Sequence, residues 1–496
     1  MMDIERLTDY TIDDVPNIME VRTDKLSPVQ SSTFRHTFRL DESGFLDKNT
    51  LLLFKAQRNA GTAVRFNCWN GCLGAIKRVI LRCGDFTLQD LDKAGLWSSL
   101  NHLYKASPDN QNKFFSHYLH NQLFYKVVDE FSVGSDSAKF GEGIKTGSII
   151  PDYDESGCDW GAATDGTGAA INAMEITGNL SQNFKNAIPL GMLLPALMNT
   201  SLPLFLFQNY RINLIVEFED DASQFANDTG RKDYSAGESM DAPTNAVRFS
   251  EVELLQDILI YPSSVQEKYQ ERTLADGGYN LDFVNVNTIL KQVPSTTADT
   301  TQSVEHRLNV TGEEVHYIQN IRQFASASAA TGENKVLLGQ RADGVSVESF
   351  NYVVNGIETY PNPYSNPLSL YNQMSYVIKR DLQVPKPLYV NDPSTQYSLL
   401  TSPQSGLQGK YKPTGLDLQN GNKGVQGAGT MIGNYPIIVR YTRKPHDAIS
   451  KTIDAATTKV AENETGTIDN TYFVGTTRIC NIKTMSDGSQ SVVVAN

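Results

Sequence analysis

Apolar and polar residues alternate along much of the chain, from the N-terminal part to the C-terminal part. Phe34, His36 and Phe38 are separated by Arg35 and Thr37, and residues 210–218 and 304–310 alternate in the same way. A period of two places every second side chain on one face of a β-strand. Further strand-like runs are residues 51–54, 79–81, 252–260, 279–286, 350–354, 437–441 and 477–482. Since no regular succession of strand and helix is present, the pattern predicts an all-β protein.

Helical spacing is confined to a few segments. Apolar residues recur three and four positions apart in residues 96–104 and again in residues 370–378. This spacing predicts two short amphipathic helices, the first with Ser99 on its solvent face. A third short helix is predicted for residues 112–127.

The two amphipathic helices follow similar segments, which indicates a duplication. Val79 and Ile80 precede a glycine turn before the first helix, and Val353 and Val354 do so before the second. A chain of 496 residues is also too long for one ordinary core. We therefore predict an N-terminal arm (residues 1–25), an N-terminal domain (26–261) and a C-terminal domain with tail (262–496). The boundary lies at Tyr261 and Pro262.

Three segments stand apart from the strand pattern. Residues 132–178 and 401–433 are rich in glycine and polar residues, which predicts long loops on a β scaffold. Residues 1–25 are acidic and carry few large apolar side chains. We expect this arm to become ordered only against a neighbouring molecule.

Charge and hydropathy exclude several classes of protein. The net charge is −13 and no cluster of Lys and Arg is present, so we expect no direct binding of nucleic acid. The start Met-Met-Asp-Ile-Glu-Arg is unlike a secretory signal, so we expect synthesis inside a cell without secretion. Residues 187–210 are uncharged, but their three prolines argue against a transmembrane segment.

Candidate catalytic and metal-binding motifs are incomplete. Residues 152–157 resemble the start of a calcium loop, yet Ala163 stands where a bidentate Glu is required. His117 and His120 have no third ligand nearby. The cysteines are irregularly spaced and predict buried thiols: Cys68, Cys72, Cys83, Cys158 and Cys480. We therefore predict no catalytic, cofactor-binding or metal-binding residue, no cofactor and no enzymatic activity.

Several segments resemble the major capsid proteins of the double jelly-roll lineage, in particular those of polinton-like viruses and virophages and, more distantly, of nucleocytoplasmic large DNA viruses. Residues 31–54 are similar to the first two strands of that family. Residues 188–214 resemble its proline-broken apolar turn before a long strand, and residues 350–367 resemble the strand-and-helix unit of its second barrel.

The resemblance implies two consecutive eight-stranded jelly-roll barrels with a few short helices and long loops. It also implies a major capsid protein that forms pseudo-hexagonal homotrimeric capsomers in the icosahedral shell of a double-stranded DNA virus. The implied partners are neighbouring capsomers, penton proteins and minor capsid or cement proteins, and the implied location is the virion. Two alternatives stay open: a spike or minor capsid component, and a β-sandwich carbohydrate-binding protein.

Overall fold

The computed structural model describes residues 20–58, 65–66, 71–105, 125–128, 148–151, 185–197, 201–207, 209–221, 225–227, 247–275, 277–324, 347–359, 414–419, 429–444, 449–453, 456–461, 466–487 and 489–495. Antiparallel strands dominate this part of the chain, which confirms the predicted all-β class.

The strands before residue 261 form two main antiparallel sheets. The first has the order β11-β5-β15-β4-β12, with β1 also paired to β15. Its strands are β1 (Glu20–Leu26), β4 (Phe45–Leu46), β5 (Leu51–Arg58), β11 (Asn186–Pro189), β12 (Leu202–Pro203) and β15 (Val247–Ile260). The second has the order β2-β3-β13-β7-β8. Its strands are β2 (Gln30–Ser31), β3 (Arg35–Arg39), β7 (Ile76–Cys83), β8 (Phe86–Asp92) and β13 (Ile212–Phe218).

The strands after residue 262 form their own two main sheets. One has the order β16-β26-β18-β21, with β22 paired to β18 and β27 to β26. Its strands are β16 (Tyr279–Val293), β18 (Glu314–Phe324), β21 (Thr414–Asp417), β22 (Thr430–Met431), β26 (Ile468–Thr484) and β27 (Gln490–Ala495). The other has the order β17-β23-β19-β20. Its strands are β17 (Gln302–Leu308), β19 (Val347–Val354), β20 (Ile357–Glu358) and β23 (Ile437–Arg443).

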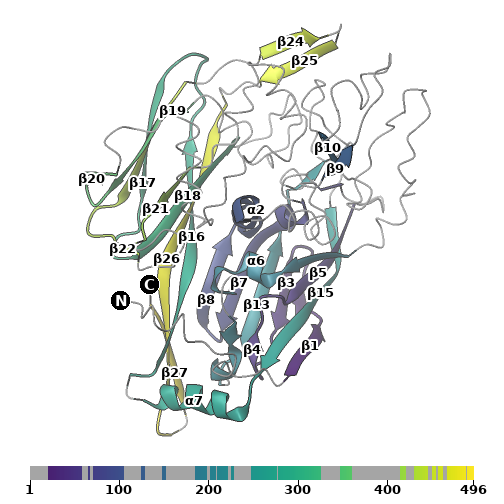
Figure 1. Ribbon diagram of the computed structural model, residues 1–496, viewed down its shortest axis with the longest axis vertical. Helices are drawn as coiled ribbons and strands as arrows, with labels where there is room; N and C mark the ends of the chain where they lie inside the picture. The colour runs from purple at the N-terminus through teal and green to yellow at the C-terminus, as the bar shows by residue number, and fades with distance from the viewer. Residues whose placement is uncertain are drawn as a thin grey trace, which may run out of the picture.

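Short elements complete the described structure. Three two-stranded sheets pair β6 (Arg65–Phe66) with β14 (Ala226–Asn227), β9 (Tyr125–Val128) with β10 (Ser148–Pro151), and β24 (Ile449–Ile453) with β25 (Ala456–Ala461). The helices are η2 (Gly71–Ala75), α2 (Ala94–Lys105), α6 (Leu190–Leu193), η4 (Pro195–Leu197), η5 (Leu204–Phe207) and α7 (Ser263–Leu274). Helix α7 connects the two sets of sheets at the bottom of Figure 1.

Both halves follow the same strand order. In chain order, the eight principal strands of the first half are β1, β3, β5, β7, β8, β11, β13 and β15. Those of the second half are β16, β17, β18, β19, β20, β21, β23 and β26. The strands pair in the same way in each half. One sheet has the order 1-8-3-6, and the other has the order 2-7-4-5, when the strands are numbered along the chain. This is the jelly-roll order, and it confirms the two predicted barrels.

The hairpins that carry the duplicated segments show how closely the halves correspond. In β7–β8, Cys83 and Phe86 flank a two-residue turn with Gly84 at φ +57°, and in β19–β20, Val354 and Ile357 flank a turn in which Asn355 and Gly356 are both left-handed. Two-residue hairpin turns need such positive φ values. Val79 and Val353 therefore occupy the same strand of their barrels. They do not occupy the same position, because Val354 matches Cys83 at the turn.

Several local predictions need correction or lie outside the described residues. The arm boundary at residue 25 falls inside β1, because residues 20–26 pair with β15 along their whole length. The predicted helix at 112–127 ends in a strand, since β9 begins at Tyr125. The predicted helix at 370–378 lies outside the described residues, as do most of residues 132–178 and much of 401–433. The prediction of uninterrupted loops was wrong, because β10 lies within 132–178 and β21 and β22 lie within 401–433.

Helix α2 confirms the first predicted helix, but Ser99 does not face solvent. Ser99 is buried, and its hydroxyl donates to the carbonyl of Gly95 at 2.8 Å. Trp97, Ser98 and Leu100 are buried as well. Figure 1 shows α2 in the space where the purple-to-teal first barrel and the green-to-yellow second barrel meet. Because residues 97–101 are all buried, this part of α2 is a core element.

The uncharged segment 187–210 is folded into the first barrel. It forms β11, α6, η4, β12 and η5, and it places Leu193, Phe205 and Phe207 in the hydrophobic core. Pro189 ends β11, Pro195 begins η4 and Pro203 ends β12, so the chain changes direction repeatedly inside the barrel. Among the described residues, no helix is both long and apolar enough to cross a membrane.

Candidate assembly surfaces

The described residues contain no candidate metal centre. No group of three or more His, Cys, Asp or Glu side chains in this part of the chain could hold a metal ion. Cys72, Cys83 and Cys480 are buried thiols, and burial raises the pKa of Cys83 and of Cys480 to about 12. A protonated, buried thiol is a poor nucleophile. Segment 152–157, His117, His120, Cys68 and Cys158 lie outside the described residues.

The junction between the barrels joins β8 of the first barrel to β16 and β26 of the second. The hydroxyl of Thr288 donates to the carbonyl of Asp92 at 2.8 Å, and Arg478 Nη1 donates to the carbonyl of Leu88 at 3.1 Å. Gln89 Nε2 donates in the other direction, to the carbonyl of Val284 at 3.4 Å. The edge strand β8 is therefore covered by side chains of the second barrel, and its carbonyl groups are partly satisfied there.

Helix α2 adds a polar pair to the same junction. Gln319 Nε2 on β18 donates to Asn101 Oδ1 at 3.1 Å, and Asn101 Nδ2 is 3.4 Å from Gln319 Oε1. Both side chains are buried. A reciprocal amide pair has one favourable alignment, so it positions α2 against the second barrel as well as satisfying both groups.

The C-terminal strand β27 holds the second barrel to the base of the first. The hydroxyl of Tyr210 donates to the carbonyl of Gln490 at 2.7 Å, and Gln490 Nε2 donates to the carbonyl of Leu206 at 2.6 Å. Val492, from the same strand, is buried in the hydrophobic cluster of the first barrel. At the C-terminal end of the chain, β26 is thus the eighth principal strand of the second barrel, and β27 makes this attachment.

The junction is also a continuous apolar core. The cluster that fills the first barrel includes side chains from the second half of the chain: Val286, Ile321, Phe473, Cys480, Ile482 and Val492. Burying a large apolar side chain contributes roughly 1.5–3 kcal/mol. Five of the six are large apolar side chains, so their burial fixes how the two barrels are held together within one chain.

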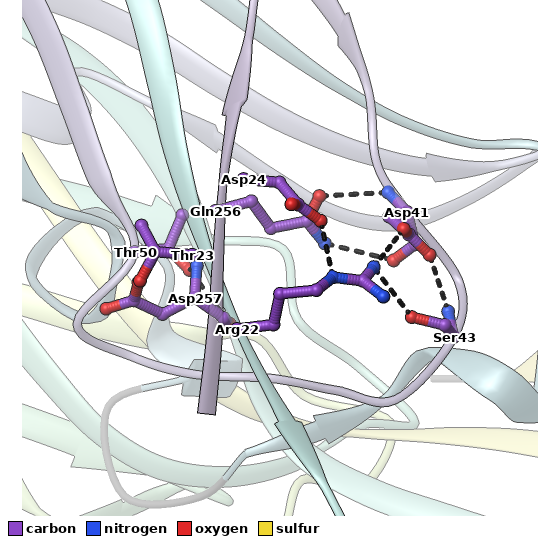
Figure 2. A network of polar contacts seen from close by, with 8 residues as sticks. All are labelled: Arg22, Thr23, Asp24, Asp41, Ser43, Thr50, Gln256 and Asp257. Atoms are coloured by element: carbon purple, nitrogen blue, oxygen red, sulfur yellow. Dashed lines mark hydrogen bonds and ion pairs between the residues drawn. The ribbon is translucent and has the colours of Figure 1, made fainter. Parts of the chain in front are cut away.

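A polar network fixes β1 to the first barrel (Figure 2). Arg22 Nε donates to Asp24 at 2.8 Å, and Arg22 Nη2 contacts both Asp41 and the hydroxyl of Ser43. Gln256, which is fully buried, bonds the backbone of Asp41 through both ends of its amide, at 2.9 and 3.0 Å. The connection after β3 is thus tied to β1 and β15 together.

A second set of contacts in the same view joins β1 and β15 near the start of β5. The hydroxyl of Thr23 donates to Asp257 at 2.5 Å, and the backbone amide of Asp257 donates to the hydroxyl of Thr50 at 3.0 Å. Because these contacts and the Arg22 network engage both faces of β1, we expect the strand to stay in place without help from another molecule.

Ion pairs cross the outer faces of the barrels. On the first barrel, Glu251 contacts Lys55 and Lys185, and Glu253 contacts Lys185 and Lys25. Glu251 lies at a β-bulge with φ +47°, which turns its side chain toward the two lysines. Exposed pairs of this kind contribute little to stability and more to the choice of partner.

Exposed apolar side chains gather at one end of the second barrel. Ile357, Met431 and Tyr435 are 72%, 62% and 67% exposed. Asn355 holds their segments together, because its side chain donates to the carbonyl of Met431 at 3.1 Å and accepts from the amide of Gly433 at 2.8 Å. We call Ile357, Met431 and Tyr435 the β20 patch. Exposed apolar groups on a rigid edge mark an interaction surface.

No protein-family model and no curated protein matches the chain. Solved structures do match it. PBCV-1 VP54, fitted into a reconstruction of the virophage Sputnik, is 14% identical with a TM-score of 0.54, over 99% of this chain and 100% of that one. A model of the PBCV-1 virus capsid is 12% identical with a TM-score of 0.52, over 99% and 100%. The Faustovirus major capsid protein is 11% identical with a TM-score of 0.46, over 97% and 94%.

The likeness to the two PBCV-1 structures extends over nearly the whole chain. Together with the strand order of both barrels, it shows that the chain has the double jelly-roll fold of these viral capsid structures. The resemblance noted in the sequence is therefore confirmed for the fold.

Proposed function

We propose that this protein is the major capsid protein of an icosahedral double-stranded DNA virus and that it forms homotrimeric capsomers of pseudo-hexagonal outline. One observation carries the proposal: two barrels with the same strand order are held side by side by a buried junction within one chain. Three such chains offer six similar barrels around a threefold axis, and closed rings of this kind are a common form of assembly.

The same architecture accounts for the absence of a predicted active site. Each barrel consists of strands around a packed interior, and the connections at the barrel ends are available for contacts with other molecules. The protein has no enzymatic role in this proposal and needs no cofactor. Its partners are neighbouring capsomers and, at the vertices and seams, penton and minor capsid or cement proteins.

Light scattering of the purified protein tests the trimer. We expect a single species of three times 54.9 kDa at micromolar concentration, with interfaces of the obligate class above about 2,000 Å². Negative-stain images should show a pseudo-hexagonal outline. A stable monomer that binds a glycan array would instead support a carbohydrate-binding protein and would contradict the capsid proposal.

The N-terminal arm gives a second test, with a boundary that the structure sharpens. In this proposal residues 1–19 act between capsomers, whereas residues 20–26 form β1 of the first barrel. Deleting residues 1–19 should leave a trimer that melts within a few degrees of wild type but does not assemble into shells. Deleting residues 1–26 should also destabilise the barrel, because β15 loses a strand. Normal shell assembly by the shorter deletion would contradict a role for the arm.

A further inference from the structure

The contact between the barrels of one chain joins two unlike edges. β8 is the fifth principal strand of the first barrel, and it lies against β16, the first principal strand of the second. The counterpart of β8 in the second barrel is β20, and the counterpart of β16 in the first barrel is β1. A junction of the same kind would therefore bring β20 of one barrel against β1 of another.

Both counterparts are on the outside of the chain. Among the described residues, β20 pairs only with β19 and β1 pairs only with β15. The β20 patch is exposed beside the first of these strands, and Val21 is 59% exposed on the second. Ile357 directly follows its hairpin turn, as Phe86 does at the start of β8. The free edge at β20 thus carries an apolar side chain at the place where β8 carries Phe86, and the free edge at β1 carries exposed Val21.

Both edges are also rigid, which lowers the entropy cost of docking. Asn355 fixes the β20 patch, and the Arg22 network in Figure 2 fixes β1. Beside β1, Lys25 pairs with Glu253 at 2.8 Å, and beside β20, Glu358 pairs with Arg440 at 3.4 Å. These exposed pairs leave polar groups at the rim of each apolar contact, as in stable protein interfaces.

We infer that the β20 patch of one chain docks on β1 of a second copy of this chain, repeating between chains the β8–β16 contact made within each chain. This inference rests on the proposed trimer. The contact is heterologous, so repeating it from chain to chain can give a closed ring. In a ring of three chains, three β8–β16 contacts within chains alternate with three β20–β1 contacts between chains.

Two variants test the edge assignment by light scattering. Ile357→Asp should convert the trimer to monomer at micromolar concentration, since it places a charge in the apolar contact. Leu274→Asp is the matched control, because Leu274 is 59% exposed at the end of α7 and belongs to neither β1 nor β20. Both variants should fold, since both sites are exposed. A trimer that survives Ile357→Asp would overturn the inference.

Cross-linking shows which edges meet. A chain carrying Ile357→Cys together with Val21→Cys should give covalent trimers on a denaturing gel after treatment with a short bismaleimide, above the background of wild type. Either single variant should stay at that background. Cross-linked products from Ile357→Cys alone would mean that like edges meet and would overturn the inference. If the double variant is a trimer by light scattering but gives no cross-links, the edge inference is overturned while the proposed trimer stands. A wild-type monomer would remove both the trimer and the edge contact.

Discussion

The two barrels share one strand order but fill their interiors with different chemistry. The first barrel is packed with aromatic rings: Phe218 stacks on Phe249 with centroids 4.2 Å apart, and Phe54 meets the edge of Phe218 at 5.0 Å. The second barrel buries two guanidinium groups, those of Arg322 and Arg443, each with 1% exposure. Among the described residues, no Arg, Lys, Asp or Glu of the first barrel is buried to this degree.

Aromatic and polar neighbours accommodate these charges. Arg322 lies over the rings of Phe350 and Tyr441, 5.6 and 5.5 Å from their centroids. His306 Nδ1 is 2.7 Å from the hydroxyl of Tyr472. Cation–π contacts and buried hydrogen bonds offset part of the cost of desolvation. The jelly-roll order therefore needs strands whose inward faces are buried, but the side chains on those faces need not all be apolar.

The largest expected effect comes from a charge placed where the barrels meet. Leu100→Asp should lower the free energy of unfolding by more than about 4 kcal/mol, because it removes an apolar contact and buries a carboxylate. Leu100→Met is the matched control and should cost less than about 1.5 kcal/mol. Denaturant titration followed by circular dichroism measures both. If Leu100→Asp cost no more than the control, α2 would not be a core element.

A cavity in the aromatic core should be nearly as damaging. Phe218→Ala should lower the free energy of unfolding by about 3–5 kcal/mol, since Phe218 contacts two other buried phenylalanines. Phe86→Ala, at a ring that is 37% exposed, should cost less than half as much. Equal losses in the two variants, measured by the same denaturant titration, would argue that the first barrel does not depend on its aromatic packing.

The polar core should make the second barrel sensitive to acid. Burial, with Lys291 and Arg322 nearby, lowers the pKa of His306 from 6.5 to about 4. Its neutral form is favoured in the folded state, so the stability that it contributes is complete above pH 6.5 and is lost as the pH falls to 4. The loss should reach roughly 3 kcal/mol.

His306→Phe should flatten this part of the pH profile while it keeps a ring of similar size. Hydrogen exchange resolved by segment should place the wild-type change in β17, β23 and β26, with β5 and β13 little altered. An unchanged acid slope in His306→Phe would remove His306 as its cause.

The first barrel carries a titrating group of the opposite sign. Burial raises the pKa of Glu219 from 4.5 to about 7, against the opposing effect of Lys77 and Lys93. Its contribution to stability is complete below pH 4.5 and is lost as the pH rises through 7. Glu219→Gln should therefore stabilise the protein at pH 8 and have little effect at pH 4. Thermal melting at both values measures the difference, and a larger gain at pH 4 would contradict the assignment.

The smallest effects are expected on the outer faces, where the barrels are alike. Arg78 pairs with Asp90 on the first barrel and Arg440 with Glu305 on the second, at 2.5 and 3.0 Å. Arg78→Ala and Arg440→Ala should each cost less than about 1 kcal/mol and less still in high salt. If only one of the two variants lost more than about 2 kcal/mol of unfolding free energy, the barrels would differ in their surfaces as well as in their interiors.

The sequence determined the local elements, because strand and helix patterns depend on residues a few positions apart. The alternation at 210–218 became β13, and the helical spacing at 96–104 became α2. The duplication was visible for the same reason, since each barrel repeats one hairpin with a glycine at its turn. The double jelly roll itself came from the resemblance of these segments to a known family.

The tertiary structure alone decided what lies between the elements. Ser99 was expected in solvent, yet it is buried, because α2 packs against η2, β7 and α6. Residues 20–25 looked unstructured because their partner, β15, begins more than two hundred residues later. Arg322 was not foreseen as a core residue, since its burial depends on the rings of Phe350 and Tyr441 from the opposite sheet. The burial of a residue depends on segments that are distant in the sequence, and a local pattern contains no information about which segments will pack against it.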